Sequence, residues 1–371
     1  MTPVEFRRHL HRHPELSFRE RATARFIAEA LTAEGIAWRP VAGTGILAVI
    51  EGRRPSPRAV VLRADIDALP VEEQTGLEYA SVNPGVMHAC GHDVHAAVVF
   101  GVLQRLKRER DFDGTVIGLF QPGEECNPGG ASKVLGERPF DGYEVVAVVG
   151  EHVEPTLEVG QAGFRAGQYM AASDEIRFHV TGCGGHAALR HTTADTVRAA
   201  ARMVVAATDL NTADRIVSIG RVEAQGATNV IPDRVELEGT MRTFSEELRR
   251  ATYDELHSLA ERIAADERVQ IEVDINRGYP SVVNDPRLVT LAEKTAREAG
   301  FETVQLDLRP TAEDFGFYTQ CYPSLFYRLG VGPSAGGLHT AGFSPDERAV
   351  DAGVELMRRI AKKILSRTDY E

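Results

Sequence analysis

Short apolar runs and longer amphipathic segments alternate along the first half of the chain. Four apolar runs predict β-strands: ILAVI (46–50), AVVLRA (59–64), TVIGLF (115–120) and VVAVVG (145–150). The last two are apolar at nearly every position, which is typical of strands buried on both faces. Residues 93–107 predict a helix whose start Asp93 is able to cap. This alternation of strands and helices indicates an α/β fold in which an open sheet carries helices on both faces.

Capping residues mark where helices are expected to begin. Thr2 and Glu5 form a capping-box signature for a helix over residues 2–12. Ser17 and Glu20 repeat that signature and predict the start of a second helix. The N-terminal segment is therefore expected to contain two capped helices before the first strand.

The pattern changes between residues 170 and 280. Strand-like and helical segments here follow the order β-α-β-β-α-β: EIRFHVTG (175–182), 195–209, VSIGRVEAQG (217–226), RVELEGTMRTF (234–244), 245–265 and VQIEVDI (269–275). That order is typical of a ferredoxin-like α+β unit. The sequence thus predicts a main α/β domain over 1–170 and 280–371, built on an open mixed sheet, and a smaller inserted domain over 171–279.

The α/β pattern resumes after the insert. Asp285, followed by a proline, predicts the start of a helix, and residues 324–329 predict a strand. Ser344, also followed by a proline, predicts the start of the last helix, with Glu347 in the capping-box position.

Composition and charge exclude several classes of protein. The chain has 371 residues and a net charge of −12, which argues against a surface for nucleic acid or anionic membranes. No apolar run approaches the ~18 residues of a membrane span. The four cysteines lie far apart and form no C-x-x-C pair, as expected for a reduced cytoplasmic protein in which a special cysteine is a ligand or a nucleophile.

The densest group of reactive side chains is MHACGHDVH, at residues 87–95. Residues two apart in an extended segment face the same side, so Cys90 and His92 can converge on one point. A thiolate and an imidazole suit zinc and other late divalent metals. The alternative is a polar loop whose histidines cap a helix.

Two further segments follow predicted buried strands. QPGEE (121–125) supplies two adjacent carboxylates, of which one can bind a cation while the other faces a substrate. VVAVVG is followed by Glu151 and His152, and GGLHTAGF places His339 in a glycine-flanked loop. A solvated acidic turn is the alternative for QPGEE, and a structural histidine for His152.

RADIDALP (63–70) offers Asp65 and Asp67 on one side of an extended segment. A histidine that binds a metal usually donates its second N–H to a carboxylate, and Asp67 is the candidate for that role. The alternative is a turn-capping aspartate before Pro70. The insert adds His186 after flexible glycines, together with Asn229 and Arg242, a donor-rich set that suits a carboxylate or an oxyanion.

In their order along nearly the whole chain, these motifs resemble one family: dinuclear-metal amidohydrolases and peptidases that include hippurate hydrolase, indole-acetyl-amino-acid hydrolases and N-acetyldiaminopimelate deacetylase. The resemblance is carried by HRHPELSFRE, RADIDALP, MHACGHDVHAA, QPGEE, GGHAA, NVIPDRVELEGTMRTF, AEDF and LHTAGFSPDE. The sequence departs from the family's usual proline at Arg190 and at Ala341. Neither position is a proposed metal ligand.

The resemblance implies a zinc-peptidase-like catalytic domain and a lid domain through which the chain forms a homodimer. Five residues would then hold two divalent ions, of zinc, manganese, cobalt or nickel, with the sulfur of the cysteine shared: Cys90, His92, Glu125, His152 and His339. Glu124 would be the general base. His186 would complete the active site, in the partner subunit of the dimer, while Asn229 and Arg242 would bind the substrate carboxylate or backbone.

The expected reaction is hydrolysis of an N-acyl amino acid to a carboxylic acid and a free amino acid. Three alternatives remain open from the sequence. A dipeptidase would use the same metals with a lid that admits an aminoacyl group. A metal-holding binding protein would have lost catalysis, and a cysteine hydrolase would use Cys90 as nucleophile with His92 as base.

Overall fold

The computed structural model of the protein describes residues 1–366 and consists of two compact units. Unit 1 comprises Met1–Gly167, Val283–Asp307 and the chain from Asp314 onward. Unit 2 comprises Gln168–Val282 and the short segment Leu308–Glu313. The chain of unit 1 is therefore interrupted by unit 2.

Unit 1 is built on one eight-stranded sheet with the order β1-β2-β4-β3-β5-β16-β6-β15. Its strands are β1 (Ala37–Val41), β2 (Gly45–Glu51), β3 (Arg54–Asp65), β4 (Asp113–Gln121), β5 (Glu144–Glu154), β6 (Gln161–Phe164), β15 (Glu302–Gln305) and β16 (Ser324–Gly330). The four central strands run parallel, whereas β1, β2 and the β6–β16 pair are antiparallel. The expected open mixed sheet is confirmed.

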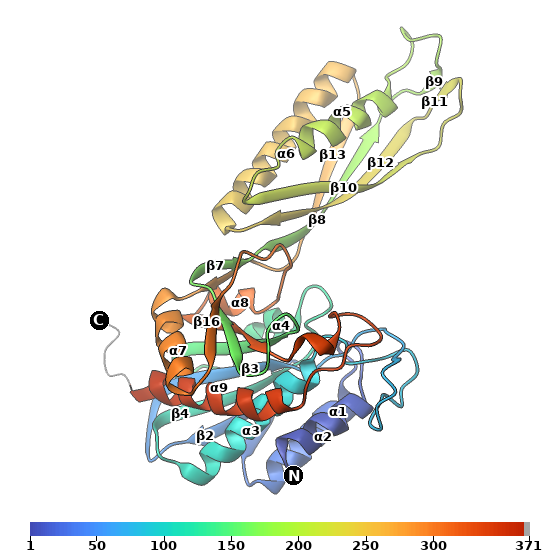
Figure 1. Ribbon diagram of the computed structural model, residues 1–371. Helices are drawn as coiled ribbons and strands as arrows, with labels where there is room; N and C mark the ends of the chain where they lie inside the picture. Colours follow the sequence, from blue (N-terminus) through green and yellow to red (C-terminus); the bar gives the residue numbers. More distant parts are fainter. Residues whose placement is uncertain (367–371) are drawn as a thin grey trace. The chain divides into compact units, whose positions relative to one another are not determined.

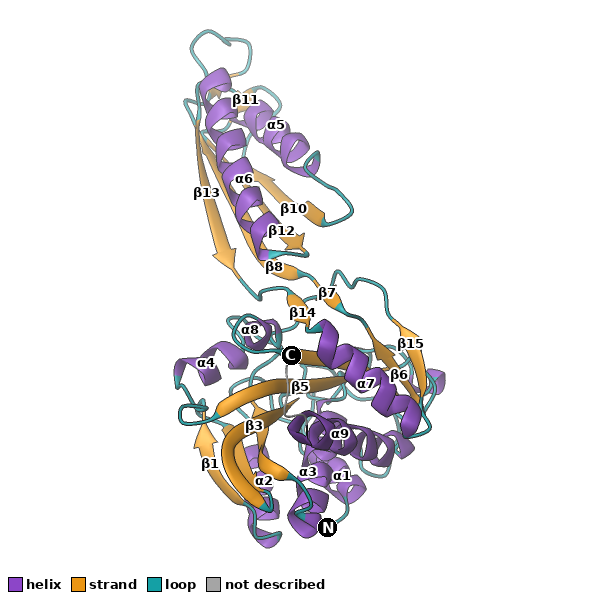
Figure 2. Cartoon of the chain, turned by 90° about the vertical axis from the view of Figure 1, so that its left-hand side faces the viewer, coloured by secondary structure: helices purple, strands orange, loops and turns teal. Residues whose placement is uncertain are grey.

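Helices cover both faces of this sheet. They are α1 (Pro3–Arg12), α2 (Arg21–Ala33), α3 (His92–Glu109), α4 (Gly130–Gly136), α7 (Pro286–Glu298), α8 (Gly316–Thr319) and α9 (Arg348–Ser366), with a 3-10 turn at Pro333–Ala335. Helices α3 and α9 lie against one face, and α4 and α8 lie on the other (Figure 2). Figure 1 shows α9 running beside α3. Their close approach requires Gly353, where a Cβ would lie 2.7 Å from side-chain atoms of Val98 and Leu329.

The predicted capping box at Thr2 is present: its side chain accepts from the backbone N–H of Glu5, and the Glu5 carboxylate accepts from Thr2. The one predicted at Ser17 is wrong. Helix α2 begins at Arg21, and Glu20 makes no side-chain capping bond. The carboxylate of Glu15 instead accepts from the Thr23 N–H at 2.9 Å.

Two other predicted caps are also wrong, although the helix expected over 93–107 is present and starts at His92. Gly91 occupies the N-cap of α3 with φ +84°, and Asp93 binds Arg7 and His11 instead of capping the helix. Helix α9 begins at Arg348, and Glu347 forms an ion pair with Arg8. In each case the acidic side chain that the local signature assigned to a cap instead binds residues far away in the sequence.

Unit 2 contains a four-stranded antiparallel sheet with the order β10-β12-β8-β13. Its main elements are β8 (Ala172–Thr181), α5 (Thr196–Thr208), β10 (Arg215–Ala224), β12 (Arg234–Thr243), α6 (Glu246–Glu267) and β13 (Gln270–Arg277). A two-stranded ribbon pairs β9 (Gly185–His186) with β11 (Val230–Ile231). If the four main strands are numbered by their order in the chain, they lie side by side in the sheet in the order 4-1-3-2. This is the arrangement of the expected ferredoxin-like α+β unit. The long segment of unit 2, Gln168–Val282, is joined to unit 1 at β7 (Gly167–Met170) and β14 (Val282–Asn284).

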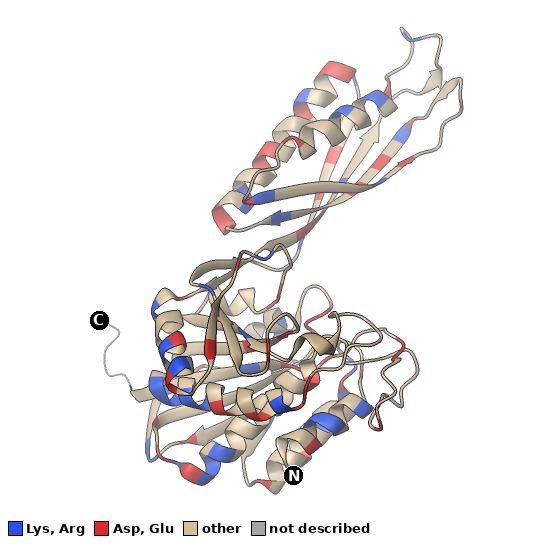
Figure 3. Cartoon of the chain, in the orientation of Figure 1, with Lys and Arg blue, Asp and Glu red and all other residues tan. Residues whose placement is uncertain are grey.

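One face of the unit 2 sheet packs on its two helices, and the other is polar. Along β8, buried residues such as Ile176 and Phe178 alternate with partly exposed ones. Neighbouring strands carry cross-strand ion pairs, including Arg177 with Asp274. Figure 3 shows acidic and basic residues interspersed over the elements of both units. Within residues 1–366, no helix is both long and apolar enough to cross a membrane.

Candidate metal centre

The sheet of unit 1 brings the ends of its central strands together. Asp65, the last residue of β3, lies opposite Gln121, the last residue of β4. His152 lies within β5, which continues four residues beyond the predicted run VVAVVG. Because the carboxyl ends of parallel strands share one edge, the segments that follow them converge there.

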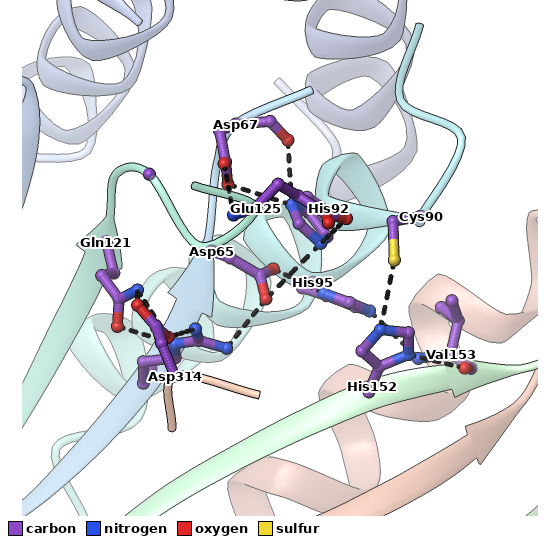
Figure 4. Close-up of polar contacts among 12 residues, drawn as sticks. Asp65, Asp67, Cys90, His92, His95, Gln121, Glu125, His152, Val153 and Asp314 are labelled. Carbon is purple, nitrogen blue, oxygen red and sulfur yellow. Dashed lines mark hydrogen bonds and ion pairs between the residues drawn. The ribbon is translucent and has the colours of Figure 1, made fainter. Parts of the chain in front are cut away.

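The five candidate metal ligands of unit 1 come together at this edge. The Cys90 sulfur lies 3.4 Å from His152 Nε2 and 3.3 Å from His339 Nε2 (Figure 4 shows the His152 contact). Glu125 Oε1 lies 3.4 Å from His339 Nε2 and 3.8 Å from His92 Nε2. Five side chains from four separate segments thus point at a common centre.

Two triads within this cluster have ligand atoms that all lie within 4.8 Å of one another: Cys90–His92–His152 and Cys90–Glu125–His339. Cys90 belongs to both, so its sulfur is the ligand atom that these two triads have in common. Thiolate, imidazole and carboxylate form a donor set for late divalent cations.

Hydrogen bonds fix the tautomers of two histidines in the form that a metal ligand needs. His152 Nδ1 donates to the Val153 carbonyl at 2.8 Å, and His92 Nδ1 donates to the Asp67 carbonyl at 2.9 Å. In both rings the Nε2 lone pair therefore faces the cluster. His92 Nε2 and Glu125 Oε1 are buried and have no hydrogen-bond partner among the described residues. Buried polar atoms are rarely left unpaired, so a cation at this centre fits the residues present.

Charge in the cluster also favours a cation. Burial lowers the pKa of His152 well below its ordinary value, which keeps this imidazole neutral. Burial also opposes charge on His92, but the Asp65 carboxylate outweighs it and raises the pKa of His92 well above its usual range. Positive charge is therefore favoured at His92 Nε2, and a bound cation would supply it in place of the proton. Burial raises the pKa of the Cys90 thiol to about 12. Since only the thiolate is a strong ligand or nucleophile, Cys90 requires a neighbouring positive ion in order to ionise.

His339 reaches the centre from the loop that follows the 3-10 turn. Its backbone adopts φ +62°, a left-handed conformation that is uncommon for histidine. Its N–H donates to the Ala89 carbonyl at 2.8 Å, next to Cys90. The adjacent Glu125 carboxylate, 3.4 Å from His339 Nε2, raises the pKa of His339. Such strain at a candidate ligand is typical of functional sites.

Glu124 and Glu125 follow the tight turn at Gly123, which closes β4. Gly123 has φ +62°, and a Cβ there would lie 2.3 Å from the ring of Phe18, so only glycine fits. The Glu124 side chain is buried and its carboxylate belongs to a group with His92 and Glu125 within 4.8 Å. Both acidic residues of QPGEE therefore face the metal centre, not bulk solvent.

Asp67 connects the start of α3, which carries His92, to the turn after β4, which carries Glu125. Its Oδ1 accepts from His92 Nδ1 at 3.2 Å, and its Oδ2 accepts from the Glu125 N–H at 2.9 Å (Figure 4). Burial would raise the pKa of Asp67, but these hydrogen bonds lower it. Asp67 thus stays a carboxylate that orients one candidate ligand through its ring and another through its backbone.

A buried ion network lies beside the cluster and was not predicted from the sequence. Arg63 donates to Asp65 at 2.8 Å and to Asp314 at 2.6 Å, and Gln121 donates to both oxygens of Asp314. Asp65 Oδ1 also accepts from His95 Nδ1 at 2.6 Å. Arg63 and Asp65 are two apart on β3 and share a face, which is the one sequence signal that pointed here.

The candidate residues of unit 2 fall into two places. His186 pairs with Val230 across the β9–β11 ribbon, and the Asn229 carbonyl accepts from the Ala187 N–H at 2.9 Å, so His186 and Asn229 are neighbours. Arg242 lies near the opposite end of β12 from Arg234. Within unit 2, the fold therefore brings two of the three donors together and holds the third apart.

Comparisons with known proteins show the family to which the chain is related. Residues 61–363 match the sequence profile of peptidase family M20/M25/M40. The chain is 37% identical to the N-acetyl-L-cysteine deacetylase of Bacillus subtilis, over 98% of this chain and 88% of that protein. It is 34% identical to the N-acetyldiaminopimelate deacetylase of Exiguobacterium sibiricum, over 95% of this chain and 97% of that protein. A solved dinuclear metal-binding peptidase of family M20 from Bacillus subtilis has a TM-score of 0.88 and 37% identity, with 98% of this chain and 97% of that chain covered.

Proposed function

The chain belongs to peptidase family M20/M25/M40 and is a metal-dependent amidohydrolase, and we propose that it hydrolyses N-acyl amino acids to a carboxylic acid and a free amino acid. The proposed substrate class follows from relatives named as deacetylases of N-acetylated amino acids. The proposed residue roles follow from the geometry of the metal centre.

One observation carries the proposal: two ligand triads share Cys90, and the buried carboxylate of Glu124 lies beside them. We assign Cys90, His92, Glu125, His152 and His339 to two divalent ions. Zinc, manganese, cobalt and nickel all accept this donor set. A binding protein would need the ligands but has no use for the second carboxylate.

Divalent ions in such a site supply Lewis acidity, which polarises a carbonyl and lowers the pKa of water towards ~7. Glu124 is the proposed general base: it takes the proton of the attacking water and returns it to the leaving nitrogen. Asp67 holds His92 in the tautomer that leaves Nε2 available. A positioned base of this kind typically contributes about 10²–10⁴-fold to the rate.

The proposed role of unit 2 is that of a lid and dimerisation domain. His186 Nδ1 accepts from the Ala188 N–H at 3.2 Å, which leaves Nε2–H as a donor on an exposed side chain. That donor suits the oxyanion of a tetrahedral intermediate in a partner subunit. Asn229 and Arg242 are proposed to bind the carboxylate or backbone of the substrate at separate points, because unit 2 holds these two residues apart.

A homodimer formed through unit 2 is tested by light scattering of the purified protein. We expect twice the mass of the chain for the intact protein. A monomeric protein that is fully active would contradict both the dimer and the role of His186 in a partner's site.

The substrate proposal is tested by a panel of N-acyl amino acids assayed with zinc, manganese, cobalt and nickel in turn. We expect release of acid and free amino acid with at least one metal, and none after removal of metal. Free-amine dipeptides are the matched comparison: faster cleavage of these would favour the dipeptidase. Full activity after complete chelation would favour the cysteine hydrolase, although burial of the Cys90 thiol disfavours it.

We also propose a cytoplasmic location. All four cysteines of the chain are free thiols in this structure. Thiols persist in reducing compartments, whereas exposed ones such as Cys183 tend to be oxidised elsewhere. Fractionation of the producing cells, with the activity assayed in each fraction, tests this location.

A further inference from the structure

Residues 15–20, ELSFRE, connect α1 to α2 and lie against the proposed metal centre. The Ala68 N–H donates to the Glu15 carbonyl at 2.9 Å, which anchors this segment beside the loop that carries Asp67. Ser17 and Glu20, which the sequence pattern assigned to a helix cap, make their hydrogen bonds to that centre instead. We call residues 15–20 the buttress segment.

Ser17 acts on the carboxylate of Asp67. Its hydroxyl donates to Asp67 Oδ2 at 2.7 Å, the same oxygen that accepts from the Glu125 N–H. Asp67 is buried, and its other oxygen accepts from His92. A single hydroxyl therefore helps to fix the orientation of a carboxylate that holds two proposed ligands.

Glu20 acts on the turn that carries Glu124 and Glu125. It is fully buried, and its Oε1 accepts from the Gly123 N–H at 2.8 Å and from the Phe18 N–H at 2.9 Å. Its Oε2 accepts from the hydroxyl of Thr44 at 2.6 Å. A buried carboxylate is costly unless its acceptors are used, and here three donors, including the Gly123 N–H of the turn, use them.

Phe18 adds a contact between the buttress segment and the turn at Gly123. Its backbone has φ +61°, a left-handed conformation that bulky residues rarely adopt, and its ring packs directly on Gly123. The Lys133 ammonium lies 3.4 Å from the centre of the same ring. The strained backbone at Phe18 is what lets its neighbours Ser17 and Glu20 reach two different segments of the centre.

We propose that Ser17 and Glu20 are positioning residues of the metal centre: Ser17 orients Asp67, and Glu20 holds the Gly123 turn so that Glu124 and Glu125 face the ions. This inference rests on the proposed function, because it assumes that the five ligands hold cations. It assigns to the side chains of Ser17 and Glu20 a role in metal retention and turnover beyond the role of the buttress segment in stability.

The test uses purified holoprotein and five variants. S17A and E20A remove the two contacts, while S17T and E20Q retain a hydroxyl and an acceptor at the same places. The matched control is E15A, because Glu15 belongs to the same segment but its carboxylate only caps α2. For each protein we would measure the rate of metal release to a chelator, kcat and KM on an N-acyl amino acid, and Tm.

Loss of an outer partner of a metal ligand typically costs 10–100-fold in metal affinity or activity. Ser17 and Glu20 act one contact further out, so we expect S17A and E20A to release metal up to about 10-fold faster and to lose kcat with little change in KM. S17T and E20Q should recover most of both. E15A should lower Tm and leave metal release and kcat unchanged.

Wild-type metal release and kcat in both S17A and E20A would overturn the inference, as would an equal loss in E15A. S17A removes one half-buried hydroxyl and serves as the test if E20A does not fold. The measurements on the wild-type protein separate this inference from the proposed function. If the wild-type protein retains metal but hydrolyses no amide, the proposed function is contradicted. The comparison of metal-release rates then still tests whether Ser17 and Glu20 position the metal centre. A wild-type protein that holds no metal overturns both.

Discussion

Glu124 and Glu125 are chemically identical and adjacent, yet the structure gives them different surroundings. Glu125 Oε1 points to His92 and His339, and the Glu125 backbone is held by Asp67. Glu124 is the more deeply buried of the two and is not needed to complete either triad that shares Cys90. The two roles of ligand and base can therefore be separated by mutation.

Replacing Glu124 with glutamine should abolish turnover without releasing metal. The amide keeps the shape of the side chain but cannot take a proton, so we expect kcat to fall by about 10²–10⁴-fold. Metal content, measured by atomic emission on the purified variant, should equal that of wild type. Near wild-type turnover would show that another group is the base.

Asp67→Asn should weaken the metal centre although it is nearly isosteric. The Asp67 carboxylate accepts hydrogen bonds from three donors: His92 Nδ1, the Glu125 N–H and the Ser17 hydroxyl. An amide must present its own N–H₂ to one of these donors, so one contact is lost. We expect a 10–100-fold loss in metal affinity or kcat, measured by chelator competition and steady-state kinetics. Unchanged values in both assays would remove Asp67 from the proposed role.

At this scale the sequence predicted residues whose chemistry is rare and clustered, such as Cys90 and His92. It failed for Ser17 and Glu20, because a capping-box signature describes only local partners. Their actual partners, Asp67 and Gly123, lie far away in the chain, and no local pattern encodes such contacts.

Among the elements, α1 is joined to the start of α3 by a buried ion network. His11 on α1 donates from Nδ1 to Asp93 at 2.9 Å and from Nε2 to Glu73 at 3.2 Å. Arg7 contacts the same Asp93 oxygen at 2.6 Å. Since Asp93 directly follows His92, this network fixes the helix end that carries a proposed ligand.

The network predicts a pH-dependent contribution of Glu73 to stability. Burial would raise the pKa of Glu73, but hydrogen bonds from His11, Thr75 and Ser81 lower it to about 2. Because the folded-state pKa lies below the ordinary value of 4.5, the contribution is complete above pH 4.5 and is lost as pH falls towards 2.

The measurement is the difference in Tm between wild type and E73Q as a function of pH. We expect a constant gap, with wild type more stable, between pH 5 and 7, and a shrinking gap below pH 4.5. A gap of the same size at pH 3.5 as at pH 7 would contradict the role of the Glu73 charge.

Helices and strands were predicted correctly where their burial requires a long run of residues that is either periodic or apolar throughout. Strands β4 and β5 were found because central parallel strands are apolar throughout. Strand β15 (Glu302–Gln305) was missed, because its four residues are partly exposed and too short to show a period. The continuation of β5 through His152 was missed because polar residues there face the site, not solvent.

At the scale of the whole molecule, the ferredoxin-like insert was predictable because its order of elements is local and its sheet alternates between a covered and a polar face. The strand order of the main sheet was not. Strand β16 pairs with β5 across the entire insert, and that pairing depends on contacts between distant segments.

Removal of metal should destabilise the folded protein, since the ligands of unit 1 come from separate segments. A cation that binds only the folded state at a hundred times its Kd adds about 2.7 kcal/mol to the free energy of unfolding. We expect a lower Tm after dialysis against a chelator and its recovery when a divalent ion is restored. The same Tm with and without metal would contradict the claim that these ligands hold a cation that stabilises the folded protein.

The central claim is that Cys90, His92, Glu125, His152 and His339 together hold two divalent ions with the sulfur shared. Anomalous diffraction from crystals of the metal-loaded protein, collected at the absorption edge of the added metal, tests it most directly. The account predicts two peaks per chain, both within bonding distance of the Cys90 sulfur and each within reach of at least one of the histidines. Peaks located elsewhere, or ions that do not touch Cys90, would contradict it.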